Sequence, residues 1–157
     1  MTTPFLAPPD RTAMRLAHQA RVLFADTDQM GVVYHASYLR YLEAARVELL
    51  RAAGMSVPAF EPLGLGLPLT EVAVRYRAFA RYDDRMSVHC GISALSSVRV
   101  HFDYVITIEP GDRLGLEAPL EVLWAQTRHA CIRIDDGRPT RMPASLVALL
   151  ESCYTPR

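Results

Sequence analysis

The stretch Arg21–Gly54, RVLFADTDQMGVVYHASYLRYLEAARVELLRAAG, decides the fold. Its beginning continues a weakly alternating segment, so that Met14–Ala25 is predicted to form the first strand. A polar turn follows, in which the carboxylates Asp26 and Asp28 precede Gly31. Glycine at this point lets the backbone take a positive φ or approach another group closely.

A long helix is predicted to begin at about His35. Its apolar residues recur at the three-to-four spacing of one helix face. They are Leu39, Leu42, Ala45, Leu49 and Ala53, and the stripe is widened by Tyr38, Tyr41 and Leu50. An apolar surface this wide indicates a mostly buried helix. Gly54 stands where a left-handed C-terminal cap is expected.

A carboxylate-bearing turn directly before a helix start places two groups close together that can act on a carbonyl group. The first N–H groups of a helix lack internal partners and carry partial positive charge. They can polarise a carbonyl oxygen, while a carboxylate before the helix reaches the carbonyl carbon or an attacking water. This combination suits acyl transfer or hydrolysis.

Composition sets the class of protein. A chain of 157 residues with 50% hydrophobic residues fits one domain, and we expect a flexible tail at 1–13 and a single domain at 14–157. The formal net charge is zero and the pI about 7.0, which gives no electrostatic reason to bind nucleic acid. No signal peptide or membrane span is predicted. Three widely spaced cysteines fit the reducing cytoplasm.

The rest of the chain alternates as strands do. Strands are predicted at Leu69–Phe79, Met86–Leu95, Val98–Ile108 and Leu120–Ile134, the last as one bent strand. A proline- and glycine-rich loop occupies Ser56–Pro68, and a short helix is expected at Pro143–Leu150. One long helix and a run of antiparallel strands predict an α+β domain with the helix packed on the sheet.

Two motifs resemble a known family. The segment DQMGVVYHASY, Asp28–Tyr38, and the helix behind it resemble the hotdog-fold acyl-CoA thioesterases, in particular the 4-hydroxybenzoyl-CoA thioesterase group and its YbgC-type relatives. The segment ARYDD, Ala80–Asp84, resembles the second landmark of that family. The resemblance covers roughly residues 15–157. It implies a hotdog fold, an antiparallel sheet of about five strands wrapped around one long central helix.

The resemblance also implies site residues. Asp28 would act as nucleophile or general base, and the backbone N–H of His35 would donate to the oxyanion. Gly31, Tyr34 and Tyr38 are candidates for substrate binding. Three of these residues have a simpler interpretation: Asp28 as a turn aspartate bonding its own backbone, His35 as a capping or packing residue and Tyr38 as a core residue. Asp26 is expected to shape the turn.

Further substrate contacts are implied at the sheet. Glu71 stands where family members often carry an acidic residue near the acyl pocket, although a solvated strand residue is an equal alternative. Ser96, Ser97 and Arg99 occupy the hairpin where relatives contact the CoA phosphates. Arg99 is the only basic residue in this hairpin, which otherwise offers Ser96 and Ser97, so these contacts could instead fall to Arg77, Arg81 or Arg85. The acyl carrier could be CoA or acyl carrier protein.

The expected activity is hydrolysis of an acyl-CoA thioester without a metal or redox cofactor. The alternatives are a hotdog dehydratase or hydratase on acyl thioesters and a non-catalytic acyl-binding protein. Unprotected sheet edges and the resemblance predict a homodimer or homotetramer. In such an assembly Asp28 would face a pocket completed by a second chain near Glu71 and the segment 76–81.

Overall fold

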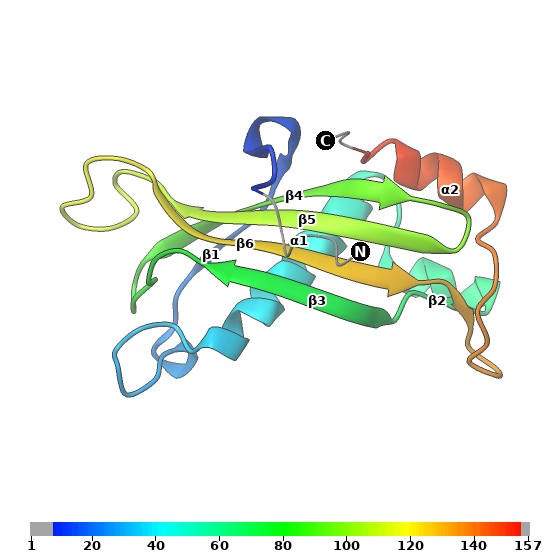
Figure 1. Ribbon diagram of the computed structural model, residues 1–157, viewed down its shortest axis with the longest axis horizontal. Coiled ribbons are helices and arrows are strands. Elements are labelled where there is room, and N and C mark those ends of the chain that lie inside the picture. The colour runs from blue at the N-terminus through cyan, green and yellow to red at the C-terminus, as the bar shows by residue number, and fades with distance from the viewer. Residues whose placement is uncertain (1–7, 155–157) are drawn as a thin grey trace, which may run out of the picture.

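A computed structural model describes residues 8–154. Within these residues, five strands form one antiparallel sheet in the order β1–β4–β5–β6–β3, and α1 (Tyr38–Ala52) lies across one face of it (Figure 1). The strands are β1 (Arg15–Arg21), β3 (Leu69–Tyr76), β4 (Arg85–Leu95), β5 (Arg99–Ile108) and β6 (Leu120–Ala130). The predicted α+β architecture is confirmed.

Shorter elements complete the domain. β2 (Leu65–Gly66) pairs with β7 (Ile132–Arg133), and α2 (Ala144–Glu151) follows near the end of the chain. Between residues 8 and 154, four 3-10 segments lie at Arg11–Ala13, Phe24–Asp26, His35–Ser37 and Val57–Leu63. No helix in the described part of the chain is long and apolar enough to cross a membrane.

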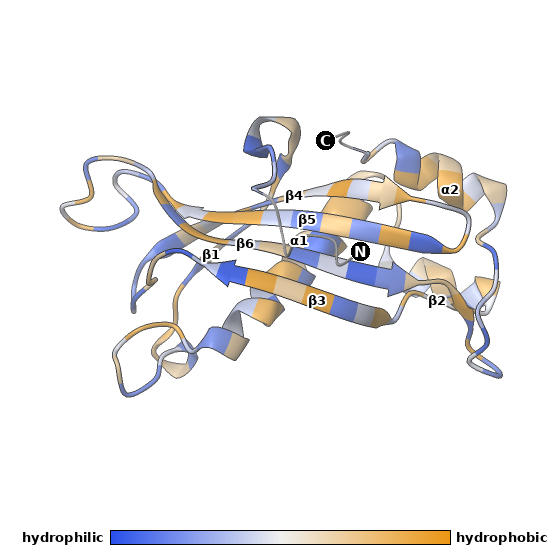
Figure 2. Cartoon of the chain, viewed as in Figure 1, coloured by the Kyte–Doolittle hydropathy of each residue, from blue (hydrophilic) through white to orange (hydrophobic). Residues whose placement is uncertain are grey.

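The core forms where the sheet faces the helix. Val100, Phe102, Tyr104, Ile106 and Ile108 alternate along β5, and all are completely buried. Hydrophobic and hydrophilic bands alternate along β5 and β3 in Figure 2. Each fully buried large apolar side chain stabilises the fold by roughly 1.5–3 kcal/mol. The two-residue period in the sequence therefore fixes which face of the sheet receives α1.

Burial of α1 is less complete than the sequence predicted. One side packs into the core through Tyr38, Tyr41, Leu42, Ala45, Leu49 and Leu50. The other side is open to solvent, and Leu39 at its first turn is 39% exposed. The expectation of a mostly buried helix is wrong for a single chain, because one sheet covers only one side. The predicted cap is confirmed: Gly54 has φ 93°, and the N–H of Met55 reaches the carbonyl of Leu50 at 2.9 Å.

Three strand boundaries differ from the predictions by more than one residue, and one of them is the strand predicted at Leu69–Phe79, which ends at Tyr76. The first strand ends at Arg21 rather than Ala25, because Phe24–Asp26 winds into a 3-10 turn. The predicted single strand Leu120–Ile134 is interrupted at Cys131, whose N–H and carbonyl bond to Val98 and Thr140 outside the sheet ladder. Both interruptions come from hydrogen bonds of the backbone outside the sheet ladder, which periodicity does not report.

The predicted tail, 1–13, lies partly outside the described residues, which begin at Pro8. Its last three residues, Arg11–Ala13, form a 3-10 turn capped by Asp10. The guanidinium of Arg11 bonds to Glu109 at 2.9 Å, just beyond β5. This contact ties the end of that segment to the sheet.

Candidate active site

The turn that carries Asp28 is a tight hairpin. The N–H of Asp28 donates to Val32 at 3.0 Å, and the N–H of Gly31 donates back to the carbonyl of Asp28 at 2.9 Å. Gly31 has φ 70°, a left-handed conformation that a residue with a Cβ adopts only at a cost. The glycine expected from the sequence is therefore required by the closure of this turn.

The carboxylate of Asp28 is only partly engaged. The side chain is half-buried, and its Oδ1 accepts the N–H of Met30 at 2.8 Å, as in an Asx turn. Among residues 8–154 no donor reaches its second oxygen. The local turn bond therefore fixes the side chain and leaves one carboxylate oxygen open for other chemistry.

Asp26 has the opposite surroundings. Its side chain is 3% exposed and accepts hydrogen bonds from the Leu23 N–H at 3.1 Å, from the Tyr41 hydroxyl and from Arg40. Burial raises the pKa of this carboxyl, but the bonds from Tyr41, Leu23 and Arg40 outweigh it and hold the pKa below its usual value. The prediction that Asp26 shapes the turn is confirmed, because the carboxylate joins the hairpin to α1.

His35 opens the helical segment. His35–Ser37 forms a 3-10 turn that runs directly into α1, and in the described chain the N–H of His35 has no acceptor. Its exposed ring packs against Tyr34 with ring centroids 4.3 Å apart, and its carbonyl accepts the Tyr76 hydroxyl at 2.8 Å. The free N–H points away from the helix, as an oxyanion donor would.

The hairpin sets the spacing between the two predicted groups. Tyr34 pairs with Asp26 at 2.8 Å, so His35 lies about three residues from Asp28 along the ladder. At about 3.3 Å per residue, this corresponds to a separation on the order of 10 Å. A thioester carbonyl and an attacking water would fit between a carboxylate and an N–H group so spaced.

The second landmark braces this hairpin. The N–H of Val33 donates to Ala80 at 2.8 Å, and the N–H of Ala80 donates to the Tyr38 hydroxyl at 3.3 Å. Buried Asp84 holds the N–H of Arg81 at 2.6 Å and the Nε of Arg113 at 2.9 Å. The sequence hypothesis expected the segment 76–81 to meet Asp28 from a second chain. In the structure, Ala80 and Arg81 of the same chain contact the hairpin at Val33 and Val32, and the part that a second chain plays at Asp28 stays a prediction.

Two of the predicted substrate residues are occupied elsewhere. Tyr38 is buried, and burial raises the pKa of its hydroxyl to about 12, as expected of a core tyrosine. Glu71 bonds to Arg128 at 2.9 Å on the face of the sheet away from α1, because its neighbour Val72 pairs with the helix-facing Thr127. Within residues 8–154 no hydrogen bond joins either side chain to Asp28, whereas Tyr34 is 44% exposed beside His35.

The hairpin with Ser96, Ser97 and Arg99 lies far from Asp28. It follows the end of β4, whereas the Asp28 hairpin contacts residues just before its start (Figure 1). The 11 residues of β4 correspond to roughly 36 Å. Ser96 Oγ accepts the N–H of Arg99 at 3.1 Å, and Arg99 shares a hollow of about 250 Å³ with Arg141. Within one chain, the predicted phosphate-binding hairpin and the Asp28 hairpin therefore lie at opposite ends of β4.

Sequence reasoning missed a polar cluster under α1. Tyr104 and Thr127 hydroxyls are 2.9 Å apart, and the His129 ring lies 3.1 Å from Thr127. All three line a cavity of about 410 Å³ beside the helix. The inward alternation of β5 and β6 would have placed them on one face, but not beside a cavity. No group of three metal-ligating His, Cys, Asp or Glu side chains occurs within residues 8–154.

Comparison with known proteins defines the class. The model of the thioesterase-like superfamily matches residues 22–150. The chain therefore belongs to this superfamily, and the expected thioesterase class and hotdog fold are confirmed.

Individual relatives agree with this assignment. The acyl-CoA thioester hydrolase YbgC of Escherichia coli is 32% identical over 128 residues, 82% of this chain and 90% of that protein. The 1,4-dihydroxy-2-naphthoyl-CoA hydrolase of Thermosynechococcus vestitus is 32% identical over 136 residues, 86% of this chain and 88% of the relative. The solved 1,4-dihydroxy-2-naphthoyl-CoA thioesterase Slr0204 from Synechocystis has a TM-score of 0.72 at 27% identity, covering 85% of this chain and 93% of its own.

Proposed function

We propose that this chain hydrolyses an acyl-CoA thioester to a free carboxylic acid and CoA. The observation that carries the proposal is the half-buried Asp28 with one unengaged oxygen, a short hairpin away from the free N–H of His35. The superfamily assignment and two relatives that are CoA-thioester hydrolases by name support it. None of the relatives named above is a dehydratase or a non-catalytic acyl-binding protein by name.

The residues suggest a division of labour. Acting as general base, Asp28 takes a proton from a water whose oxygen bonds to the thioester carbon. The N–H of His35 donates to the oxyanion that develops on the carbonyl oxygen. The C–S bond then breaks, and the leaving sulfur takes up a proton. Alternatively, Asp28 attacks the thioester carbon itself and water hydrolyses the resulting anhydride. Both routes need the free carboxylate oxygen.

The carrier end of the substrate requires a second chain in this proposal. The exposed edge strand β3 carries three accessible apolar side chains, Leu69, Val72 and Tyr76, with exposed fractions of 50%, 43% and 47%. Unpaired edges of this kind tend to pair with another chain. Antiparallel pairing of two β3 strands about a two-fold axis would bring the partner's β4–β5 hairpin to the end of the sheet that carries Asp28.

That hairpin offers phosphate-binding chemistry. Arg99 and Arg141 line one hollow with the Thr140 hydroxyl, and no carboxylate of the described chain pairs with either guanidinium. Arginine binds phosphate oxygens through a planar set of donors. We therefore assign the CoA phosphates to Arg99 and Arg141 of a second chain in a homodimer or homotetramer.

Three buried cysteines without disulfides fit a cytoplasmic location.

The activity is tested by thiol release from a panel of aliphatic and aromatic acyl-CoAs. Turnover by the wild type, and its loss in Asp28→Asn, are expected. Asp135→Asn is the matched control, because Asp135 also accepts a neighbouring N–H but lies in a remote turn. Absence of turnover would contradict the proposal, and hydration of enoyl-CoA in its place would favour the dehydratase alternative.

The assembly is tested by light scattering and by mixing inactive variants. A mass of two or four times 17.5 kDa is expected. An Asp28→Asn chain mixed with an Arg99→Glu chain should recover activity, because one site of each hybrid pair then contains both intact residues. A fully active monomer, or no recovery despite hybrid formation, would contradict the shared site.

A further inference from the structure

Two cavities lie one after the other along α1. The first, of about 410 Å³, extends from Leu39 to Arg46 along the helix and faces Tyr104, Thr127 and His129 of the sheet. The second, of about 420 Å³, lies beyond Arg46, against the 3-10 segment Val57–Leu63 and β2. Each alone is within the range of roughly 300–1,000 Å³ typical of ligand pockets.

The first cavity begins close to the proposed reaction centre. Leu39 lies four residues after His35, which corresponds to about one turn, or roughly 6 Å, of helix. Arg40, in the same turn, also lines the cavity and bonds to Asp26. A thioester held at the His35 N–H could therefore direct its acyl group into this space.

The polar floor of the first cavity is internally satisfied. The Nδ1 of His129 lies 2.9 Å from the carbonyl of Leu67, so Nδ1 carries the proton. Burial lowers the pKa of His129, and its neutral ring accepts the Thr127 hydroxyl at Nε2. Thr127 in turn accepts the hydroxyl of Tyr104. The donors of Tyr104, Thr127 and His129 therefore all have partners within the protein. An apolar acyl group can cover this floor without leaving any of them unpaired.

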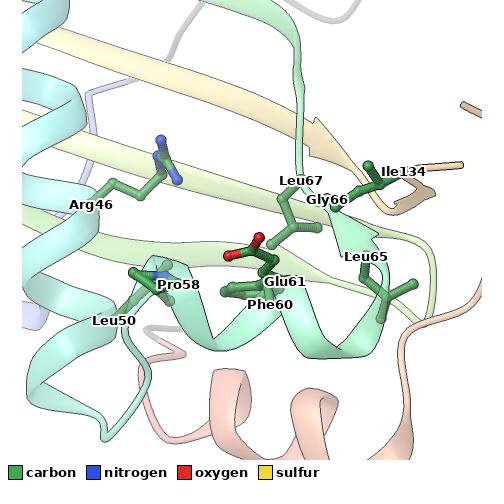
Figure 3. Close-up of a pocket in the computed structure, with 9 residues that line it drawn as sticks. All are labelled: Arg46, Leu50, Pro58, Phe60, Glu61, Leu65, Gly66, Leu67 and Ile134. Carbon is green, nitrogen blue, oxygen red and sulfur yellow. The ribbon is translucent and has the colours of Figure 1, made fainter.

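Arg46 and Leu67 line both cavities and stand where they meet. In Figure 3, Arg46 extends from α1 on one side, and Leu67 lies across from it above Glu61. The guanidinium of Arg46 forms no ion pair within the described chain. An alkyl chain passing from the first cavity into the second would remove water from this charge without replacing its hydrogen bonds, which is costly.

The second cavity is mainly apolar. Leu50, Phe60, Leu65 and Ile134 form its walls (Figure 3). Glu61, whose side chain is exposed, is the one carboxylate among its lining residues. The remaining space beyond the charge of Arg46 suits hydrocarbon, and the cavity continues the one proposed for the acyl group. The residue at the junction thus decides how far an acyl chain can extend.

We propose that Arg46 is a specificity-determining residue that ends the acyl site at the first cavity and limits the enzyme to short or compact acyl groups. The inference rests on the proposed thioesterase function. Replacing Arg46 by a small residue opens the second cavity to the distal part of a long chain. Binding improves only for acyl groups long enough to pass the junction.

The test compares kcat/KM for butanoyl-, hexanoyl-, dodecanoyl- and hexadecanoyl-CoA, all below their critical micelle concentrations. The wild type should favour the short substrates by at least tenfold. In Arg46→Ala the ratio of long- to short-chain kcat/KM should rise at least tenfold, mainly through KM. This magnitude follows from the roughly tenfold or greater discrimination that apolar pockets achieve per methylene. Arg46→Met serves as a second variant should the alanine variant fold poorly.

Arg51→Ala is the matched control, because Arg51 is on the same helix, pairs with Glu48 and lines neither cavity. Its chain-length ratio should equal that of the wild type. If Arg46 had a purely structural role, Arg46→Ala would lower kcat/KM for all four substrates by the same factor. The chain-length ratio would then stay unchanged, and the inference would be overturned. A wild type that prefers hexadecanoyl-CoA would also overturn it. No hydrolysis of any acyl-CoA would instead overturn the proposed function and the inference with it.

Discussion

Two carboxylates two residues apart in one hairpin, Asp26 and Asp28, meet opposite surroundings. Asp26 is buried and accepts three hydrogen bonds, two of them from the first turn of α1. The side chain of Asp28 is half-buried, and within the described chain only the N–H of Met30 donates to its carboxylate. A carboxylate whose lone pairs are occupied by fixed donors stabilises structure. One with a free oxygen can accept a proton or attack a carbon.

The difference assigns separate tasks to the two residues. Asp26 connects the hairpin to the helix and so fixes where the N–H of His35 lies relative to Asp28. Asp28 is held by its own turn. In the proposed function, its free carboxylate oxygen either takes a proton from the attacking water or attacks the thioester carbon. Each variant below changes one side of this comparison, in order of decreasing expected effect on activity.

The largest effect is expected at Asp28. The Asp28→Asn variant would keep the bond from the Met30 N–H, because the amide oxygen of the new side chain also accepts, so the turn should persist. The amide cannot act as base or nucleophile, and kcat should fall roughly 10²–10⁴-fold, the range of a positioned acid–base group. Asp28→Ala should lose about as much. Steady-state thioester hydrolysis and thermal unfolding measure both effects.

Two outcomes would contradict the roles assigned to Asp26 and Asp28. If Asp28→Asn retained more than a tenth of the wild-type kcat, the simpler interpretation of Asp28 as a turn residue would hold. If Asp26→Asn lost more activity than Asp28→Asn with an unchanged fold, the catalytic carboxylate would be Asp26.

A smaller loss is expected at His35. His35→Ala keeps the backbone N–H proposed as oxyanion donor and removes only the exposed ring against Tyr34. Loss of an oxyanion donor typically costs about 3–4 kcal/mol, so preserving it should keep the decrease in kcat under about a hundredfold. An effect as large as that of Asp28→Asn would make the imidazole a catalytic partner.

The elements of the fold that follow a clear period were predictable from the sequence. Alternation identified β4 and β5 almost to the residue, and the three-to-four spacing with Gly54 identified α1 and its end. The 3-10 turn at Phe24–Asp26 and the interruption at Cys131 were not predictable. They depend on single backbone bonds to residues distant in the chain or to a buried carboxylate, which carry no periodic signal.

The candidate site was predictable only where its parts are neighbours in the chain. Asp28, Gly31 and His35 fall within one hairpin and helix start, so their proximity follows from the motif. The contact of Tyr76 with His35 and the cavity shared by Arg46 and His129 depend on how β3 and β6 lie over α1. Strand register across the sheet is not contained in any short window of sequence.

Asp26→Asn should act on stability more than on activity. Tyr41 and Arg40 would face a neutral amide in a buried position, which is expected to lower the free energy of unfolding by about 1–3 kcal/mol. The activity loss should stay below that of Asp28→Asn. Urea unfolding of both variants, with circular dichroism as the readout, measures the difference.

The pH dependence gives an independent check on Asp26. Its folded-state pKa is lowered below 3.8, because hydrogen bonds outweigh burial. The contribution of the charged form is therefore present above the unfolded pKa and is lost as the pH falls through the folded pKa. The stability difference between wild type and Asp26→Asn should shrink below about pH 4. A difference that stays constant to the end of this titration would show that the charge of Asp26 contributes nothing.

The smallest effect is expected at Tyr76, which contacts the helix start from β3. Its hydroxyl donates to the carbonyl of His35 at 2.8 Å, and its ring lies 5.7 Å from that of Tyr38. Tyr76→Phe keeps the ring and removes one neutral hydrogen bond at a side chain that is 47% exposed. Such a bond contributes about 0.5–1.5 kcal/mol. The shift of His35 should therefore lower kcat by no more than about tenfold.

Tyr82→Phe is the control, because Tyr82 is 61% exposed and its hydroxyl makes no hydrogen bond within the described residues. Its kcat should match that of the wild type. If Tyr76→Phe also matches the wild type, Asp26 alone positions the helix start. If Tyr76→Phe loses as much activity as Asp28→Asn, the hydroxyl of Tyr76 contacts the substrate directly, and the free N–H of His35 is not the only donor at that end of the helix.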